Sequence, residues 1–80
     1  MKRYYYYIAI IKNGNLTDID ESSVVIGNNY NFIDYLKGHL EICKEYVNDI
    51  ICKSDNHILV NYKDKITVEY LIYKVQDINF

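Results

Sequence analysis

Histidine and cysteine side chains are the first candidates for chemistry in this chain, because either can ligate a metal or take part in nucleophilic catalysis. The chain has two histidines, His39 and His57, and two cysteines, Cys43 and Cys52. Their spacing matches none of the paired motifs that hold zinc, such as Cys-x-x-Cys or His-Glu-x-x-His. We therefore expect no metal and no cofactor, and we interpret Cys43 as a small buried residue. A catalytic Cys43 paired with a histidine is the alternative.

The glycines give no sign of phosphate chemistry. Gly14, Gly27 and Gly38 are too far apart in the chain to form a phosphate-binding loop. A chain of 80 residues also builds only a thin core, with little room for an enclosed pocket. The sequence thus favours a protein that acts by binding. A small enzyme or ligand-binding protein is the alternative.

Acidic residues offer a different chemistry, that of a negatively charged surface. Glu41, Glu45 and Asp49 follow each other at intervals of four residues, so a helix would carry them on one face about 6 Å apart. This spacing is close to that of phosphates along a nucleic-acid strand, so the row could dock on a basic surface of a nucleic-acid enzyme. An ordinary solvated helix face is the alternative. A second acidic cluster comprises Asp18, Asp20 and Glu21.

Four consecutive tyrosines, residues 4–7, begin the first predicted strand, which runs from Arg3 to Lys12. Because strand side chains alternate, two of these rings face away from whatever the other two pack on. Tyrosine is common in interface hot spots, and we expect Tyr5 and Tyr7 to contact a protein partner. Core packing of residues with high β-propensity also explains the run. Stacking on single-stranded bases is a further alternative.

A long amphipathic helix is the strongest structural signal. Its predicted extent is from the N-cap Asn31 to about Lys53, with Asp34 near the positive end of its dipole. Apolar positions recur at intervals of three and four residues, as on a core-facing helix: Ile33, Leu36, Leu40, Cys43, Val47 and Ile50. Beside this stripe lies a second row: Tyr35, His39, Ile42 and Tyr46. One helix on a sheet does not need so wide a stripe, so we expect Tyr35, Ile42 and Tyr46 to contact a partner.

Strands on both sides of the helix complete the expected fold. Asn13-Gly14 predicts a type I′ hairpin turn that leads to a second strand over 15–19, and 24–26 is an optional third strand. After the helix, the apolar positions of 58–62 and 66–72 share a face only if the loop 63–65 has three residues. The predicted class is α+β. One long amphipathic helix packs on a mainly antiparallel sheet of four or five strands, in the order β-β-(β)-α-β-β, as a single domain over residues 1–80.

Charge and hydropathy narrow the possible partners. The net charge is −2, which argues against a direct partner with a phosphate backbone or an anionic membrane. No apolar stretch approaches the roughly 18–20 residues of a membrane span, and the start of the chain does not have the pattern of a signal peptide. We therefore expect a cytoplasmic protein with reduced cysteines.

The chain has no proline or tryptophan and is rich in Asn, Ile, Lys and Asp, a bias typical of AT-rich bacteria and their phages. In size, composition and one-helix-on-a-sheet pattern it resembles small phage-encoded inhibitors of bacterial defence, above all anti-CRISPR proteins. That resemblance implies binding to a nuclease or effector complex in the bacterial host cell. The aromatic first strand, Tyr4–Ile11, followed by the predicted helix is also similar to HicB-type antitoxins, which implies a small toxin as partner.

The sequence therefore predicts a non-enzymatic protein-binding module, and most specifically an inhibitor from a phage or other mobile element that covers a functional surface of a bacterial defence nuclease. An antitoxin-like partner of a small toxin is one alternative. A small structural homodimer, in which the row of Tyr35, Ile42 and Tyr46 packs on itself, is the other.

Overall fold

Two long strands joined by a tight turn begin the chain. The computed structural model describes residues 2–27, 30–41 and 44–78. β1 (Lys2–Asn13) pairs antiparallel with β2 (Leu16–Gly27) along its whole length, which confirms the hairpin. The turn lies one residue later than predicted, at Gly14 and Asn15. Only Gly14 takes a positive φ, +63°, so the turn fits type II′ rather than type I′.

The five strands form one antiparallel sheet in the order β2-β1-β5-β4-β3. The later strands are β3 (Val47–Ser54), β4 (His57–Tyr62) and β5 (Ile66–Ile78). β1 is an interior strand, as its two apolar faces predict. The pairing of β1 with β5 shifts between Tyr6 and Tyr7, which leaves Tyr73 as the extra residue of a β-bulge.

The β4–β5 hairpin has the predicted register. Val60 lies opposite Val68, as the three-residue loop 63–65 requires. Asp64 and Lys65 in this loop take φ values of 66° and 61°, a conformation that costs a residue with a side chain roughly 1–2 kcal/mol. The register is kept because a shift by one residue would turn the buried side chains of the hairpin to the other face.

The helix is much shorter than predicted. α1 (Phe32–Glu41) has 10 residues, and a 3-10 turn, η1 (Lys44–Tyr46), leads from it towards β3. Its predicted start is confirmed, because Asn31 Oδ1 accepts a hydrogen bond from the Asp34 backbone N–H at 2.8 Å. The Asp34 carboxylate in turn accepts one from the Asn31 N–H at 3.3 Å, which completes a capping box. Ile42 and Cys43 lie outside the described residues.

The second half of the predicted helix is strand β3, so a long helix over 31–53 is wrong. Val47, Ile50 and Ile51 are β-branched and favour extended backbone, and pairing with β4 satisfies the backbone polar groups on one side of β3. Ile50 packs against the core from the strand instead of from a helix. The observed order is β-β-α-β-β-β rather than β-β-(β)-α-β-β, and residues 24–26 are the end of β2.

Phe32 lies at the centre of the core and is 1% exposed. The centroid of its ring lies 5.0 Å from that of Tyr7 and 5.9 Å from those of Tyr35 and Tyr70. Around it the buried residues of α1 and the strands form one cluster: Tyr5, Ile26, Leu36, Leu40, Ile58, Val60 and Ile72. Burial in this environment raises the pKa of the Tyr70 phenol, and the nearby Tyr62 and Tyr7 raise it further.

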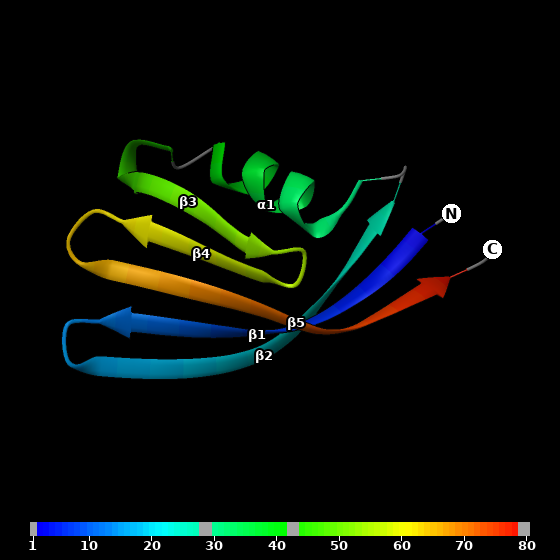
Figure 1. Cartoon of the computed structure of the whole chain (residues 1–80), viewed down its shortest axis with the longest axis horizontal. Helices are drawn as coiled ribbons and strands as arrows, with labels where there is room; N and C mark the ends of the chain where they lie inside the picture. Colours follow the sequence, from blue (N-terminus) through cyan, green and yellow to red (C-terminus); the bar gives the residue numbers. More distant parts are fainter. Residues whose placement is uncertain (1, 28–29, 42–43, 79–80) are drawn as a thin grey trace.

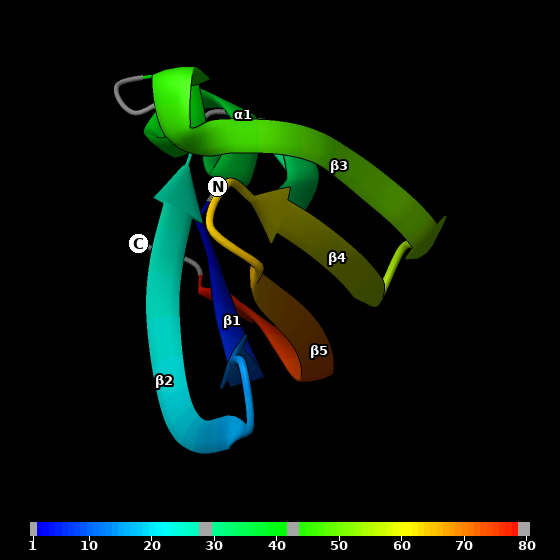
Figure 2. The ribbon, with the colours of Figure 1, turned by 90° about the vertical axis from the view of Figure 1, so that its left-hand side faces the viewer.

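α1 packs on only one face of the sheet. Figures 1 and 2 show it near β3 and β4, whereas the turn of the β1–β2 hairpin lies at the far end of the molecule from it. The core side chains of the strands all project to this side, which we call the covered face. The alternating residues project to the opposite side, which we call the open face.

Candidate functional site

The open face carries a band of apolar side chains that crosses the whole sheet. The strand registers place Ile19 of β2 beside Ile10 of β1, and Leu59 of β4 beside Ile51 of β3. Glu69 of β5 lies between Ile10 and Leu59 and completes the row. All five strands thus contribute one residue to it. The adjacent row pairs Ile8 of β1 with Leu71 of β5, so β5 also contributes an apolar side chain to the band, next to Glu69.

These apolar side chains are accessible because none of the described elements packs on this face. Ile19 is 67% exposed, Val25 45% and Ile51 40%. Ile8, Ile10, Leu59 and Leu71 are half-buried by their neighbours within the sheet alone. Scattered exposed apolar residues are normal on a small protein, whereas a contiguous apolar surface marks a site of interaction.

A group of aromatic rings occupies one end of the open face. The Tyr4 and Tyr6 rings stack with centroids 4.9 Å apart, and the Tyr6 and Tyr73 centroids are 6.3 Å apart. Lys74 Nζ lies 5.1 Å from the centroid of the Tyr6 ring, within the range of a cation–π interaction. The Ser23 hydroxyl donates a hydrogen bond to the Tyr4 phenol oxygen at 3.3 Å. These contacts hold the rings against the sheet and confirm that the side chains share one face.

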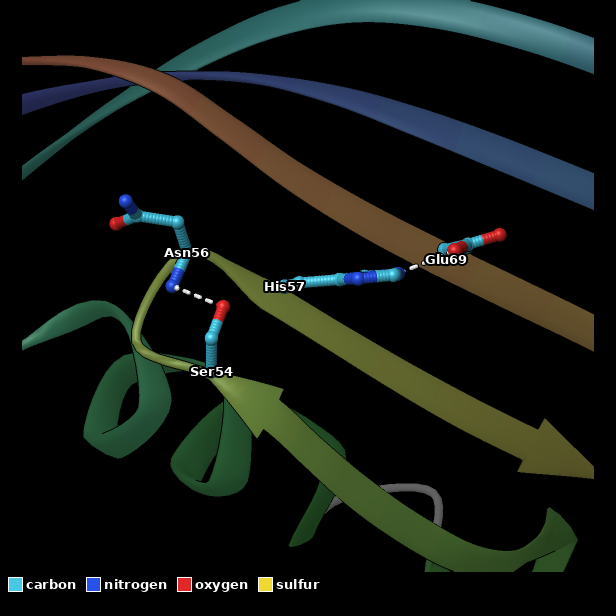
Figure 3. A network of polar contacts seen from close by, with 4 residues as sticks. All are labelled: Ser54, Asn56, His57 and Glu69. Atoms are coloured by element: carbon cyan, nitrogen blue, oxygen red, sulfur yellow. Dashed lines mark hydrogen bonds and ion pairs between the residues drawn. The ribbon is translucent and has the colours of Figure 1, made fainter.

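A single polar pair lies within the band. His57 at the start of β4 contacts the Glu69 carboxylate on β5, as Figure 3 shows. The two side chains are about a quarter exposed, at 28% and 24%. The adjacent turn is closed by a hydrogen bond from the Asn56 N–H to the Ser54 hydroxyl. Among the described residues no third histidine, cysteine or acid joins the pair to form a group that could hold a metal, and the pair satisfies its own polar atoms on an apolar surface.

The tyrosines predicted to bind a partner lie on the covered face. Tyr5 is 6% exposed and belongs to the core, and Tyr7 packs against it. Tyr4 and Tyr6 are the two rings of the run that lie on the open face, and both are partly exposed there. The sequence shows that alternate rings point in opposite directions, but only the position of α1 decides which pair is covered.

The second apolar row of the predicted helix is not a continuous surface. Tyr35 packs against the core, and its ring stacks on His39 with centroids 6.0 Å apart. Ile42 lies outside the described residues. Tyr46 is 62% exposed, but it belongs to η1 rather than to α1. Because α1 ends at Glu41, the row that a longer helix would have carried does not form.

The acidic positions are also separated by the shorter helix. Glu41 ends α1 and pairs with Lys44 of η1 at 3.1 Å, Glu45 lies in η1, and Asp49 lies in β3. They therefore do not form a row along one helix face. The other acidic cluster is exposed on the edge strand β2, and it is divided between the two faces: Asp18 and Asp20 lie on the side of the covered face, and Glu21 lies on the open face.

The covered side of the molecule has clefts, and some of their polar groups are already paired within the chain. One cleft of 330 Å³ lies at the start of α1 and is lined partly by Arg3, Asn31 and Asn56. Arg3 Nε contacts the Asp77 carboxylate at 3.1 Å, and Asn31 is engaged in the capping box. Two of the polar side chains that line the cleft are thus already engaged within the chain, and we regard the open face as the stronger candidate.

Comparison of the chain with protein-family models, with curated proteins and with solved structures gives no match in any of the three. Within the described ranges, no helix has both the length and the apolar composition that crossing a membrane requires.

Proposed function

We propose that this chain is a non-enzymatic protein-binding module and that the open face is its binding surface. The observation that carries the proposal is the apolar band that runs across all five strands without any described element packed on it. The tyrosines at one end of the band supply large, amphipathic contact area of the kind found in interface hot spots.

The charges on the open face support a protein partner rather than a nucleic acid. Lys12 and Lys74 lie on this face, but the acidic residues Glu21, Glu69 and Asp49 lie among them. A surface that binds single-stranded nucleic acid combines aromatic rings with a positively charged groove. The rings are present here, but the positive groove is not, and the whole chain carries a net charge of −2.

The most specific form of the proposal is an inhibitor that covers a functional surface of a bacterial defence nuclease or effector complex. The resemblance in size and composition to anti-CRISPR proteins supports this form. A sheet face with an apolar band suits it, because occlusion of a surface needs contact area and no catalytic group. The partner class is therefore a bacterial protein complex in the host cytoplasm.

Affinity capture tests the proposal. The tagged full chain is used as bait in a nuclease-treated lysate of bacteria that carry a defence nuclease, and the dissociation constant of the captured complex is then measured. We expect Ile8→Lys, which places a charge at the centre of the apolar band, to weaken binding at least about tenfold. The double variant E41K/E45K is the matched control, because both residues lie away from the open face, and it should bind like the wild type.

Three results would contradict the proposal: loss of the captured partner on nuclease treatment, no captured partner, or wild-type affinity of a folded Ile8→Lys variant. Functional assays then distinguish an inhibitor of a defence nuclease from an antitoxin. Expression of the chain restores phage plating in a host with the active nuclease if the chain is an inhibitor. Rescue of growth from a small toxin would instead identify an antitoxin.

A further inference from the structure

The open face approaches the size of a small protein interface. With strands about 4.8 Å apart and a rise of about 3.4 Å per residue, β2, β1 and β5 over the span from Tyr4 to Lys12, together with β4 and β3 over the part opposite Ile8–Lys12, cover roughly 500 Å². Interfaces at the lower end of the standard size bury about 600 Å² per partner. A partner sheet that covers the whole face therefore provides enough contact for a weak dimer, and leaving the apolar side chains in water is unfavourable for the isolated chain.

The edges of the sheet are poorer docking sites than its face. β3 forms one edge and has register irregularities near both of its ends, at Val47/Asp49 and Cys52/Ser54. β2 forms the other edge and carries three exposed acids at its middle. Bulges and charges on edge strands both disfavour the addition of another strand.

The open face is complementary to itself in one orientation. Ile8 and Leu71 lie opposite each other near the middle of the face. Towards one end of the strands the next row contains Tyr6 and Lys74, and towards the other end it contains Ile10 and Glu69. Two copies can stack with their open faces together, related by a two-fold axis that lies between the sheets and runs across the strands at Ile8 and Leu71. The row of Tyr6 and Lys74 in each copy then lies over the row of Ile10 and Glu69 in the other.

This exchange brings two pairs of opposite charges together, because Lys74 of each copy faces Glu69 of the other, and the Tyr6 ring faces Ile10. Glu21 lies opposite Ile8 on the edge strand β2, so it faces Glu21 of the second copy at the exposed rim. A two-fold axis along β5 would instead place Glu69 against Glu69 and Lys74 against Lys74, and like charges disfavour that arrangement. Two sheets packed in the first way would be about 10 Å apart, as in a β-sandwich.

We propose that, when no partner protein is bound, a second copy of this chain covers the open face, with Lys74 of each copy against Glu69 of the other. This inference rests on the proposed function, because it names a second copy as the occupant of the same surface. Any other partner protein would then compete with the homodimer. Self-association and binding of another protein can be disproved independently, because self-association is measured on the purified chain alone.

Two charge reversals and their mixture test this geometry. K74E places a carboxylate against Glu69 of the second copy, and E69K places an ammonium group against Lys74. Each variant alone should dimerise at least about tenfold more weakly than the wild type. In a one-to-one mixture, a heterodimer has opposite charges at both contacts. Sedimentation velocity should therefore show dimers in the mixture at concentrations where each variant alone is monomeric.

The control is K37E, a charge reversal on α1 away from the open face, which should leave the dimer unchanged. Circular dichroism establishes that K74E and E69K remain folded. Variants that had merely lost structure would not recover on mixing, so recovery supports the proposal. The proposal is overturned if the wild type is monomeric at hundreds of micromolar, if either variant dimerises like the wild type, or if mixing restores nothing.

Discussion

The covered and open faces of the sheet are made from alternating residues of the same strands, and both carry large apolar side chains near the middle of the sheet. Ile58 on the covered face is fully buried, whereas the next residue, Leu59, is half-buried on the open face. Tyr4 and Tyr5 differ in the same way. Residue type does not separate the two faces, since Ile, Leu and Tyr occur on both. The difference comes from α1, which supplies Phe32, Leu36 and Leu40 to one face only. The open face therefore carries an apolar band with polar residues around it and has no described covering layer.

The largest effect expected from this comparison is on stability. Ile58→Ala removes a fully buried side chain and should lower the free energy of unfolding by about 2–5 kcal/mol. Leu59→Ala, at the adjacent position of β4, should cost only about 1 kcal/mol, because Leu59 already contacts water. Urea denaturation of dilute protein measures both values. Equal losses would mean that the two faces are equally buried and that the open face is not open.

A smaller effect is expected at high pH, from the covered face alone. The ordinary pKa of tyrosine is about 10, and burial raises the pKa of Tyr70 above it. As the pH rises past about 10, the unfolded chain loses this proton while the folded chain keeps it, so stability falls as the pH rises. The slope should be at most about 1 kcal/mol per pH unit, because solvent partly screens the group.

Tyr70→Phe should make stability less dependent on pH above about 10. Tyr73→Phe, on a tyrosine that is exposed beside the open face, is the matched control and should keep the wild-type dependence. Denaturation curves recorded at several alkaline pH values measure both slopes. An unchanged slope in Tyr70→Phe would show that Tyr70 is not held neutral by the core.

The local parts of the fold could be predicted from sequence. The start of α1 follows from Asn31 and Asp34, three residues apart, and the loop 63–65 follows from the apolar alternation on either side of it. The end of α1 could not be predicted in the same way. Helical spacing continues by coincidence through Val47 and Ile50, while these residues form a strand because they pair with β4 across the turn 55–56, and this pairing is not visible in the helical pattern of the segment itself.

The candidate surface is harder to identify from sequence because it depends on contacts between distant parts of the chain. The sequence shows that two rings of the tyrosine run face each way, but which pair is buried depends on where α1 packs, and that is a long-range property. The sequence analysis expects Tyr5 and Tyr7 to contact a partner, whereas in the structure these two residues pack with the core and Tyr4 and Tyr6 lie on the open face. The acidic row of Glu41, Glu45 and Asp49 does not form, because these residues lie in three different elements instead of one long helix.

The tyrosines on the two faces provide the most direct test of the central claim, because they act as built-in reporters. Nuclear magnetic resonance of the purified chain can follow the ring signals of its ten tyrosines during dilution, and again when a captured partner is added. We expect the signals of Tyr4, Tyr6 and Tyr73 to shift while those of Tyr5 and Tyr70 stay in place. Shifts at Tyr35 and Tyr46 with none at Tyr4 and Tyr6 would place the interaction on the helical side and contradict the assignment of the open face.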